Sequence, residues 1–370
     1  RRFRCKVDFA ESFTATPDSA RATAIFVAHT CQRKALPHFS AEAVAALIEE
    51  THREAQDQSR QSAIFALSEA LVMESADLAL RRAAQTVQAQ DVNAAREARI
   101  HRLSYPEQRL QETIADGERL LEVRGERVAQ VNGLTVVDLG DYCFGFPVRV
   151  TARTYAGEDG LLNIEREVEL SGPIHDKGVL VLHSYLMSLF AHQAPLALEA
   201  SLVFEQEYGG IEGDSASCAE LYALLSSLAA VPLAQGIAVT GSLNANGDLL
   251  PVGGINEKVE GFFRSCERVG LDGTQGVLIP ERNRRHLMLD DRVIEAVRQG
   301  RFHVHAASTV AQGMTLLCGL PWGELGPNGY PAGSLLGRAQ ARLHRLRQAF
   351  DATGAHHEQP AHKRRHLHDH

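Results

Sequence analysis

The 370-residue sequence contains little lysine, tryptophan, methionine or cysteine. Its six cysteines are scattered, without a C-x-x-C pair or a histidine at metal-ligand spacing, which argues against a disulfide framework or a zinc site and favours reduced thiols. The first residues lack the apolar segment of a signal peptide. No G-x-x-x-x-G-K-[ST] sequence is present, so the chain cannot hold nucleotide phosphates in the P-loop manner. We therefore expect a cytoplasmic protein without a cofactor or metal of its own.

The sequence also lacks a dominant charge of one sign. Its 38 Lys and Arg are opposed by 46 Asp and Glu, for a net charge of −8, which argues against nucleic acid as a partner. One uncharged stretch, residues 221–243, is long enough to cross a membrane, but a proline and glycines interrupt it. A helix, a turn and a buried strand explain this stretch better, so we expect no membrane partner.

The N-terminal third predicts a helical unit. Residues 1–15 include an alternation of apolar and charged side chains that is typical of a strand. Because this pattern is already present at the first residues, we interpret them as the strand remnant of an upstream domain. Residues 16–104 show helical periodicity, with cap-like residues such as Thr16 and Ser40. They predict a small all-α bundle of roughly four helices without a sheet.

Residues 105–322 predict an α+β domain with mixed sheets and packed helices, because hairpin-like strands come first and βα units follow. From Leu121 onward, apolar residues between 128 and 139 alternate with glycines and polar residues and indicate the first strands. Further strand candidates are 147–154, 161–168, 198–206 and 236–243, and the helix candidates are 176–192, 215–230, 256–269 and 291–299. Asn246 and Gly247 indicate a tight hairpin. Residues 323–370 are expected to form a linker, a basic helix over 334–350 and a disordered His-rich tail over 355–370. A nucleic-acid or metal contact is the alternative role for this tail.

Two glycine-flanked turns carry the residues best suited to catalysis. Ser215 follows an acidic turn and precedes an uncharged helical run, which places its hydroxyl where free backbone N–H groups stabilise an oxyanion. Ser217 is the rival nucleophile, and a helix N-cap is the alternative role for Ser215.

Lys258 is the candidate general base. It follows two glycines and lies in the first turn of a predicted helix that also carries Val259, Phe262 and Phe263. The positive end of the helix dipole and the apolar neighbours both lower the pKa of a lysine, which suits a base working near neutral pH. A solvated surface lysine is the alternative, although the chain uses only five lysines.

These two segments together resemble the Ser/Lys catalytic dyad of the Lon proteases. The Glu-Gly-Asp-Ser-Ala-Ser sequence at 212–217 is similar to the active-site serine motif of the Lon B-type branch, with aspartate where the bacterial Lon motif has proline. Residues 237–242 and 247–258 resemble the strand–hairpin–strand that leads to the family's lysine, and 276–283 resembles the next block. The resemblance extends from about residue 120 to 320.

The resemblance implies that Ser215 is the nucleophile, that Lys258 is the base and that Thr240 hydrogen-bonds the lysine. It also implies that Glu212 and Asp214 are acidic residues flanking the site, with a solvated acidic loop as their alternative role. A further similar segment, residues 170–178, contains His175 beside Asp176 and suggests a Ser/His/Asp arrangement, which we rank below Lys258.

Residues 16–104 resemble the helical lid of AAA+ ATPases, including a Val-x-x-x-Asp-Val-x-x-Ala sequence at 87–95. Arg60 is a candidate nucleotide-sensing arginine in this region. The resemblance implies the lid and protease part of a longer ATP-dependent enzyme, in which ATP-Mg acts on an upstream ATPase core. It further implies a homo-oligomer, most simply a hexamer, that degrades unfolded or damaged polypeptides. A non-catalytic ring-assembly or substrate-binding module with a protease-like fold is the competing hypothesis.

Overall fold

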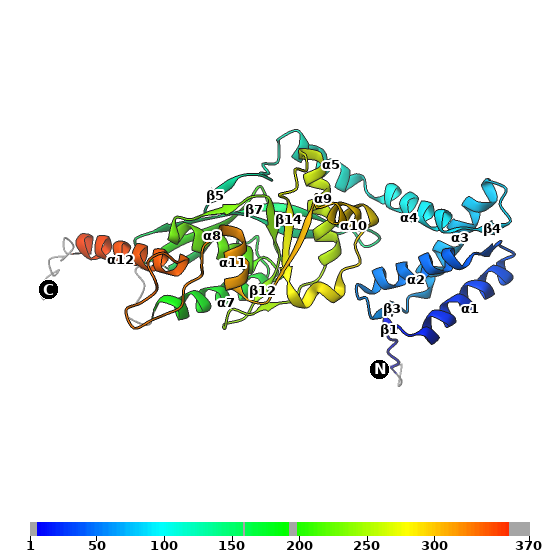
Figure 1. Ribbon diagram of the computed structural model, residues 1–370, viewed down its shortest axis with the longest axis horizontal. Helices are drawn as coiled ribbons and strands as arrows, with labels where there is room; N and C mark the ends of the chain where they lie inside the picture. Colours follow the sequence, from blue (N-terminus) through cyan, green and yellow to red (C-terminus); the bar gives the residue numbers. More distant parts are fainter. Residues whose placement is uncertain (1–5, 158–159, 192–197, 355–370) are drawn as a thin grey trace, which may run out of the picture.

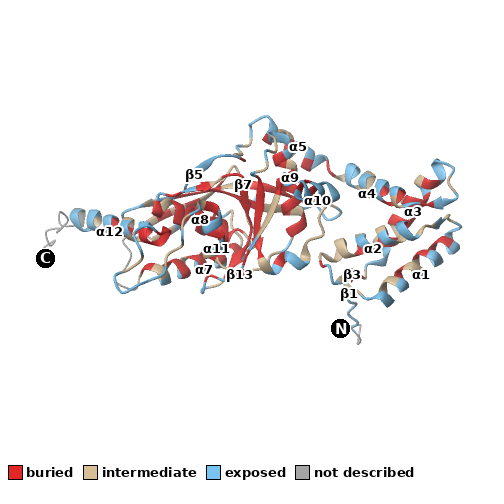
Figure 2. Cartoon of the chain, in the orientation of Figure 1, coloured by how far each residue is buried: buried red, intermediate tan, exposed pale blue. Residues whose placement is uncertain are grey.

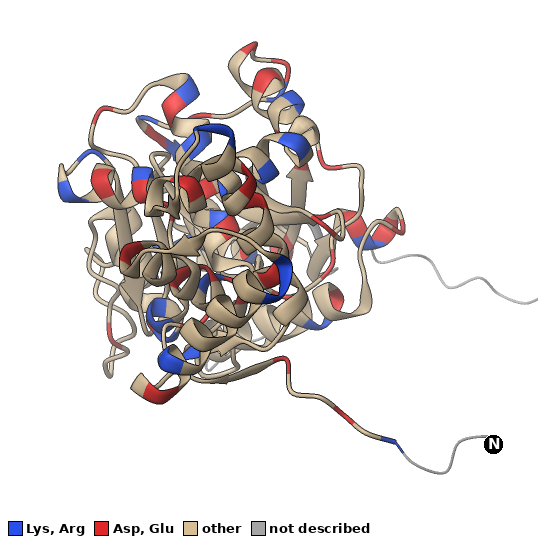
Figure 3. Ribbon diagram, turned by 90° about the vertical axis from the view of Figure 1, so that its right-hand side faces the viewer, with Lys and Arg blue, Asp and Glu red and all other residues tan. Residues whose placement is uncertain are grey.

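The computed structural model describes residues 6–157, 160–191 and 198–354. The molecule is elongated, with a helical N-terminal part at one end and a larger part built around a sheet (Figure 1). The last helix, α12 (Leu335–Gly354), projects from the end opposite the helical part. Lys, Arg, Asp and Glu are interspersed over the helices seen from the helical end, without a face of one sign (Figure 3).

The helical part packs its helices around a small apolar core. Its helices are α1 (Pro17–Lys34), α2 (Ala41–Ala55), α3 (Phe65–Arg81) and α4 (Ala89–Leu103). The side chains of Thr16 and Ser40 accept hydrogen bonds from the first turns of α1 and α2, as their sequence positions predict. Val27, Leu47 and Val72 are buried between the helices.

Short strands in this part correct the sequence-based prediction of a bundle without a sheet. They are β1 (Ser12–Thr14), β2 (His38–Phe39), β3 (Arg60–Ser62) and β4 (Thr86–Val87). β1 pairs with β3 and β2 with β4, and strands of two or three residues are too short to show a periodicity. The strand expected over residues 1–15 is confirmed only for β1, since residues 6–11 have no strand structure and residues 1–5 lie outside the described residues.

The larger part is α+β, as predicted. Its helices are α5 (Tyr105–Ala115), α6 (Ile164–Glu167), α7 (Pro173–Phe190), α8 (Ser217–Ala229), α9 (Ile255–Val269), α10 (Asp291–Arg298) and α11 (Val310–Cys318), with a 3₁₀ helix η1 (Glu281–His286). Its strands are β5 (Glu126–Val128), β6 (Gln130–Asp138), β7 (Cys143–Tyr155), β8 (Gly160–Asn163), β9 (Glu199–Glu205), β10 (Pro232–Ala234), β11 (Ile237–Val239), β12 (Ser242–Leu243), β13 (Leu249–Leu250), β14 (Gly276–Pro280) and β15 (His303–Ala307).

A seven-stranded mixed sheet in the order β15-β14-β11-β6-β7-β9-β8 forms the centre of this part. Because alternate strand residues face opposite sides, Val239 and Leu278 face one apolar core whereas Ala238 and Val277 face another. Helices α7, α8, α11 and α12 contribute to the first core, and α9 and α10 to the second. The buried residues are concentrated in the sheet and in the helices that cover it (Figure 2).

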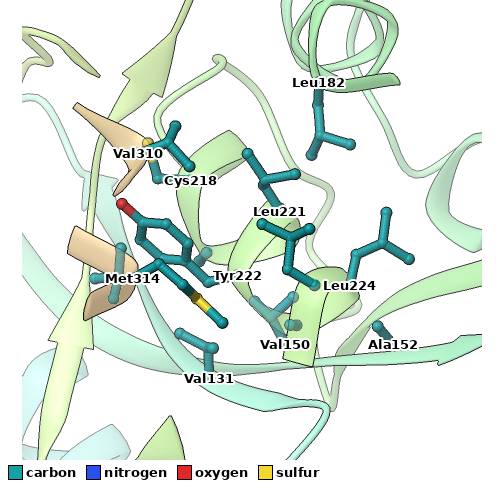
Figure 4. Close-up of a cluster of buried hydrophobic side chains, with 14 of the residues drawn as sticks. Val131, Val150, Ala152, Leu182, Cys218, Leu221, Tyr222, Leu224, Val310 and Met314 are labelled. Carbon is teal, nitrogen blue, oxygen red and sulfur yellow. The ribbon is translucent and has the colours of Figure 1, made fainter. Parts of the chain in front are cut away.

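Helix α8 is the most deeply buried helix of the first core. Its side chains Leu221, Tyr222 and Leu224 have no exposed surface. Figure 4 shows Tyr222 beside Val310 and Met314 of α11. The uncharged stretch 221–243 contains most of α8 followed by β10, β11 and β12, so the expected helix is present but three short strands replace the single strand. No helix in the described residues is both long and apolar enough to cross a membrane.

Two further predictions need correction. The strand expected over 161–168 ends at Asn163, whose side chain caps the short helix α6. The strand expected over 236–243 is divided into β11 and β12, with Thr240 and Gly241 between them. The helix expected over 334–350 is present as α12, and its apolar side chains pack into the main core; they are Leu335, Leu336, Ala339, Leu343 and Leu346. The tail 355–370 lies outside the described residues.

Candidate active site

Ser215 lies in the turn that leads into α8. The helix begins at Ser217, two residues later than the sequence suggests. Backbone hydrogen bonds tie this turn to the segment after β11, because Gly241 N–H donates to the Ser215 carbonyl at 2.8 Å and Cys218 N–H donates to the Gly241 carbonyl at 3.1 Å. The first turn of a buried helix therefore holds the serine against the central sheet.

Lys258 approaches Ser215 from the opposite core. It is the fourth residue of α9, which begins after Gly254 in the left-handed conformation (φ 64°), a conformation that favours glycine. The lysine Nζ lies 2.8 Å from the serine Oγ. The lysine is only 3% exposed, so its amine lies beside the Ser215 hydroxyl in a largely buried environment.

The surroundings of Lys258 favour its neutral form. Burial lowers its pKa to about 8, although Glu257, Asp214 and Cys143 act in the opposite direction. With this pKa, about a tenth of the Lys258 side chains are unprotonated at pH 7, and the fraction rises as the pH approaches 8. A neutral amine at hydrogen-bond distance from a serine hydroxyl can accept its proton.

A pair of glycines that sequence reasoning missed allows α9 to lie so close to the sheet. A β-carbon on Gly145 of β7 would lie 2.3 Å from the Glu257 carbonyl oxygen. A β-carbon on Gly261 of α9 would lie 1.8 Å from the Gly145 carbonyl oxygen. The backbone of α9 therefore packs directly on the backbone of β7 beside Lys258. A local sequence pattern does not predict a contact between residues so far apart in the chain.

Replacing Gly261 with alanine is expected to displace α9 from β7 and to weaken both stability and hydrolysis. Overpacking a tight contact costs about 1–3 kcal/mol, which exceeds the helix propensity of roughly 1 kcal/mol that alanine gains over glycine. Thermal unfolding and a peptide-hydrolysis assay measure the two effects. Gly333→Ala is the matched control, because a β-carbon there meets no atom within 4 Å. A Gly261→Ala protein as stable and active as the wild type contradicts this account of the packing.

Thr240 has a different partner from the one that the family resemblance implies. Its hydroxyl donates to the backbone carbonyl of Ser215 at 3.3 Å, and no hydrogen bond joins it to Lys258 within the described part of the chain. Thr240 N–H donates to the Leu278 carbonyl at 3.1 Å. Thr240 thus connects the turn that carries Ser215 to the central sheet.

Asp214 and Glu212 take different positions beside the site. The Asp214 carboxylate accepts a hydrogen bond from the Ser242 hydroxyl at 2.6 Å, and its negative charge acts on the pKa of Lys258. Glu212 is exposed, and its carboxylate lies against Gly172 at the start of α7. Asp214 is therefore part of the electrostatic environment of the lysine, whereas Glu212 lies on the outer surface of the site.

The rival candidates from the sequence have structural partners. Ser217 is buried, and its hydroxyl donates to the Asp214 carbonyl at 2.8 Å. The Nε2 atom of the buried His175 lies 3.3 Å from the Glu220 carboxylate. Asp176 accepts a hydrogen bond from Ser171 instead of pairing with this histidine. Within the described residues, neither the Ser217 hydroxyl nor the His175 ring forms a hydrogen bond with Ser215 or Lys258.

Arg60 also has a local partner. Its guanidinium donates to the hydroxyl and the backbone carbonyl of Ser12, both at 2.8 Å. It therefore joins β3 to β1 in this structure. Elsewhere in residues 6–157, 160–191 and 198–354, no group of three or more His, Cys, Asp or Glu side chains is placed to hold a metal ion.

A small pocket opens beside Ser215. Its walls include Leu134 of β6, Val148 of β7, Phe204 of β9 and Ile211. Within the described residues, the backbone N–H groups of Ser215 and Ala216 donate no hydrogen bond. The site thus combines a serine hydroxyl, a buried lysine amine, backbone N–H groups without hydrogen-bond partners and a pocket with an apolar lining.

Comparison with known proteins finds two matching family models. Residues 38–102 match the AAA+ ATPase lid domain of archaeal LonB, and residues 209–317 match the C-terminal proteolytic domain of Lon protease (S16). The second match includes the positions of both Ser215 and Lys258.

Similar curated proteins also have names that refer to Lon proteases. A Lon protease homologue of Escherichia coli (strain K12) is 41% identical over 239 residues, which cover 64% of this chain and 41% of that protein. The archaeal Lon protease of Thermoplasma acidophilum is 30% identical over 280 residues, which cover 72% of this chain and 40% of that protein. The chain therefore spans about two fifths of the length of these relatives. It belongs to the Lon protease family, of which it carries an AAA+ lid and a C-terminal proteolytic domain.

Proposed function

We propose that this chain is a serine endopeptidase in which Ser215 is the nucleophile and Lys258 is the general base. The distance of 2.8 Å between the Lys258 Nζ and the Ser215 Oγ carries this proposal. The burial that lowers the lysine pKa to about 8 supports it, because only the unprotonated amine can accept a proton.

The proposed reaction follows from the contacts of these two side chains. Lys258 accepts the Ser215 proton as the serine oxygen attacks the carbonyl carbon of the scissile peptide. The free N–H groups of Ser215 and Ala216 are candidates to stabilise the oxyanion. The lysine then protonates the leaving amine, which gives an acyl-enzyme, and water activated by the neutral lysine releases the acid and the free serine.

The pocket beside Ser215 is the candidate site for a substrate side chain. Leu134, Val148, Phe204 and Ile211 give it an apolar lining, and Glu207 and Glu212 are also among its lining residues. Apolar side chains are exposed in unfolded polypeptides and buried in folded ones. We therefore propose unfolded or damaged proteins as substrates, in agreement with the family.

The proposal also includes the assembly of the protein and its cooperation with an ATPase core. We propose a cytoplasmic homo-oligomer, most simply a hexameric ring, in which an ATPase core upstream of the lid binds ATP-Mg and unfolds substrates. Light scattering tests the ring, and a monomer at high protein concentration contradicts it. The non-catalytic assembly module is the weaker hypothesis, because such a module needs neither a buried lysine nor a serine in contact with it.

Casein, which is largely unfolded, is the test substrate for this function. The wild-type chain is expected to release acid-soluble peptides from casein without ATP, and to leave a stably folded protein of similar size intact. Unfolding is the step that the proposal assigns to the ATPase core, so a flexible substrate bypasses it. A folded wild-type protein that releases no peptide from casein favours the non-catalytic alternative.

A further inference from the structure

A buried ion pair joins the lid to the helix that carries Lys258. Arg53 lies near the end of α2 and donates from its two terminal nitrogens to the two carboxylate oxygens of Glu260, at 2.7 and 2.8 Å. It also donates to the Met288 carbonyl at 2.7 Å. The side chains of Arg53 and Glu260 are 21% and 5% exposed, so water screens this pair only weakly.

Glu260 is two residues beyond Lys258 on α9 and has further contacts. Its carboxylate accepts the backbone N–H of Asp290 at 2.8 Å and lies 3.7 Å from the Arg264 guanidinium. On the other side of Lys258, the Gln56 amide approaches the Glu257 carboxylate at 3.4 Å. The end of α2 therefore contacts the residues on both sides of the base.

The ion pair is expected to be sensitive to the loss of one partner. Burial alone would lower the pKa of Arg53, but Glu260 raises it overall, so the guanidinium stays charged. Without Arg53, the Glu260 carboxylate would keep, among the described residues, only the more distant Arg264 guanidinium and the Asp290 N–H. Breaking a buried pair by removing one partner is far more costly than losing a surface pair. Water would then enter between α2 and α9 to solvate the remaining charge.

We propose that Arg53 of the lid is a positioning residue for Lys258, acting by anchoring α9 through Glu260. This inference rests on the proposed role of Lys258. The lid thereby influences proteolysis directly, since a displacement of α2 would move the helix that carries the base. A misplacement of about 1 Å at a reacting group can cost on the order of a hundredfold in rate.

A control contact separates this role from a general loosening of the lid. Arg285 of η1 donates to the Asp57 carboxylate of the lid at 2.6 Å. This pair also joins the two parts of the chain, but neither residue belongs to α9. Arg285→Met therefore weakens the attachment of the lid while leaving Arg53 and Glu260 paired.

Labelling of Ser215 by a fluorophosphonate probe, followed by mass spectrometry in the full chain, tests the inference without a polypeptide substrate. Arg53→Met and Glu260→Gln are each expected to slow the maximal labelling rate about tenfold or more, with little change in the probe concentration that gives half the rate. The groups acting on Lys258 are Glu257 of α9, Asp214 before α8 and Cys143 of β7. If solvent reaches Lys258 in these variants, the pKa of the lysine rises. The pH at which the labelling rate is half-maximal should then move from about 8 towards the pKa of a solvated lysine.

The outcomes of this experiment separate a failure of the proposed function from a failure of the positioning role of Arg53. If the wild type is not labelled at Ser215, the proposed function fails. If it is labelled and folded Arg53→Met has the same rate and pH midpoint, the positioning role is wrong while the proposed function stands. If Arg285→Met slows labelling as much as Arg53→Met does, the positioning role is also wrong, because a weaker attachment of the lid would then explain the slower labelling. If Arg53→Met does not fold, Glu260→Gln decides in the same way, since its side-chain oxygen still accepts the Asp290 N–H.

Discussion

Replacing Lys258 with arginine is expected to abolish hydrolysis as completely as replacing it with alanine. Arginine keeps the positive charge but cannot lose its proton near neutral pH. If the lysine acts as a neutral base, both variants should fall by about two to four orders of magnitude in kcat/KM, the range that general-base catalysis contributes. If it acts only as a positive charge, the arginine variant should retain most of the activity.

A fluorogenic peptide assay of kcat/KM separates these two outcomes. Lys177→Arg is the matched control, because Lys177 is an exposed lysine on α7 in the same part of the molecule. This control should keep wild-type activity and thermal stability. An active Lys258→Arg protein would reject the dyad and would return His175 to consideration as the base.

Replacing Ser215 with alanine is expected to have the largest effect of any single substitution. The alanine removes the oxygen that bonds to the substrate, so the remaining activity should be at least on the order of ten-thousandfold below the wild type. The fold should persist, since Ser215 lies in a turn and the hydrogen bonds to its backbone carbonyl do not involve its side chain. Circular dichroism and thermal unfolding check this point.

Ser217→Ala is the matched control for the nucleophile. Ser217 lies two residues away, but its hydroxyl donates to the Asp214 carbonyl instead of approaching Lys258. Its loss should lower stability modestly, by about 1 kcal/mol, and leave most of the hydrolysis. Hydrolysis that survives in Ser215→Ala and disappears in Ser217→Ala would identify Ser217 as the nucleophile.

Local sequence signals predicted the helices beside Ser215 and Lys258, because each residue follows a recognisable turn. Two glycines before Lys258 predicted the start of a helix, and α9 begins at Ile255. The acidic turn before Ser215 predicted the other helix, although α8 begins at Ser217. The hairpin expected at Asn246 and Gly247 is also present, as β12 pairs with β13. These features depend on backbone preferences that a short segment contains.

The supporting contacts could not be predicted because they join segments far apart in the chain. Gly145 and Gly261 meet only when α9 lies on β7, and each looks like an ordinary glycine in its own segment. Arg53 and Glu260 belong to different structural units, and charges on helices are usually solvated. The hydroxyl of Thr240 has several acceptors within possible reach, so only the three-dimensional structure selects the Ser215 carbonyl.

The pH profile of kcat/KM for a fluorogenic peptide measures whether Ser215 needs an unprotonated Lys258. We expect activity to rise with pH and to be half-maximal near pH 8, the value to which burial lowers the lysine pKa. We expect Lys258→Arg to show no such rise. A wild-type profile that stays flat across that pH range, or an arginine variant that follows the wild-type curve, would contradict the role of Lys258 as the base.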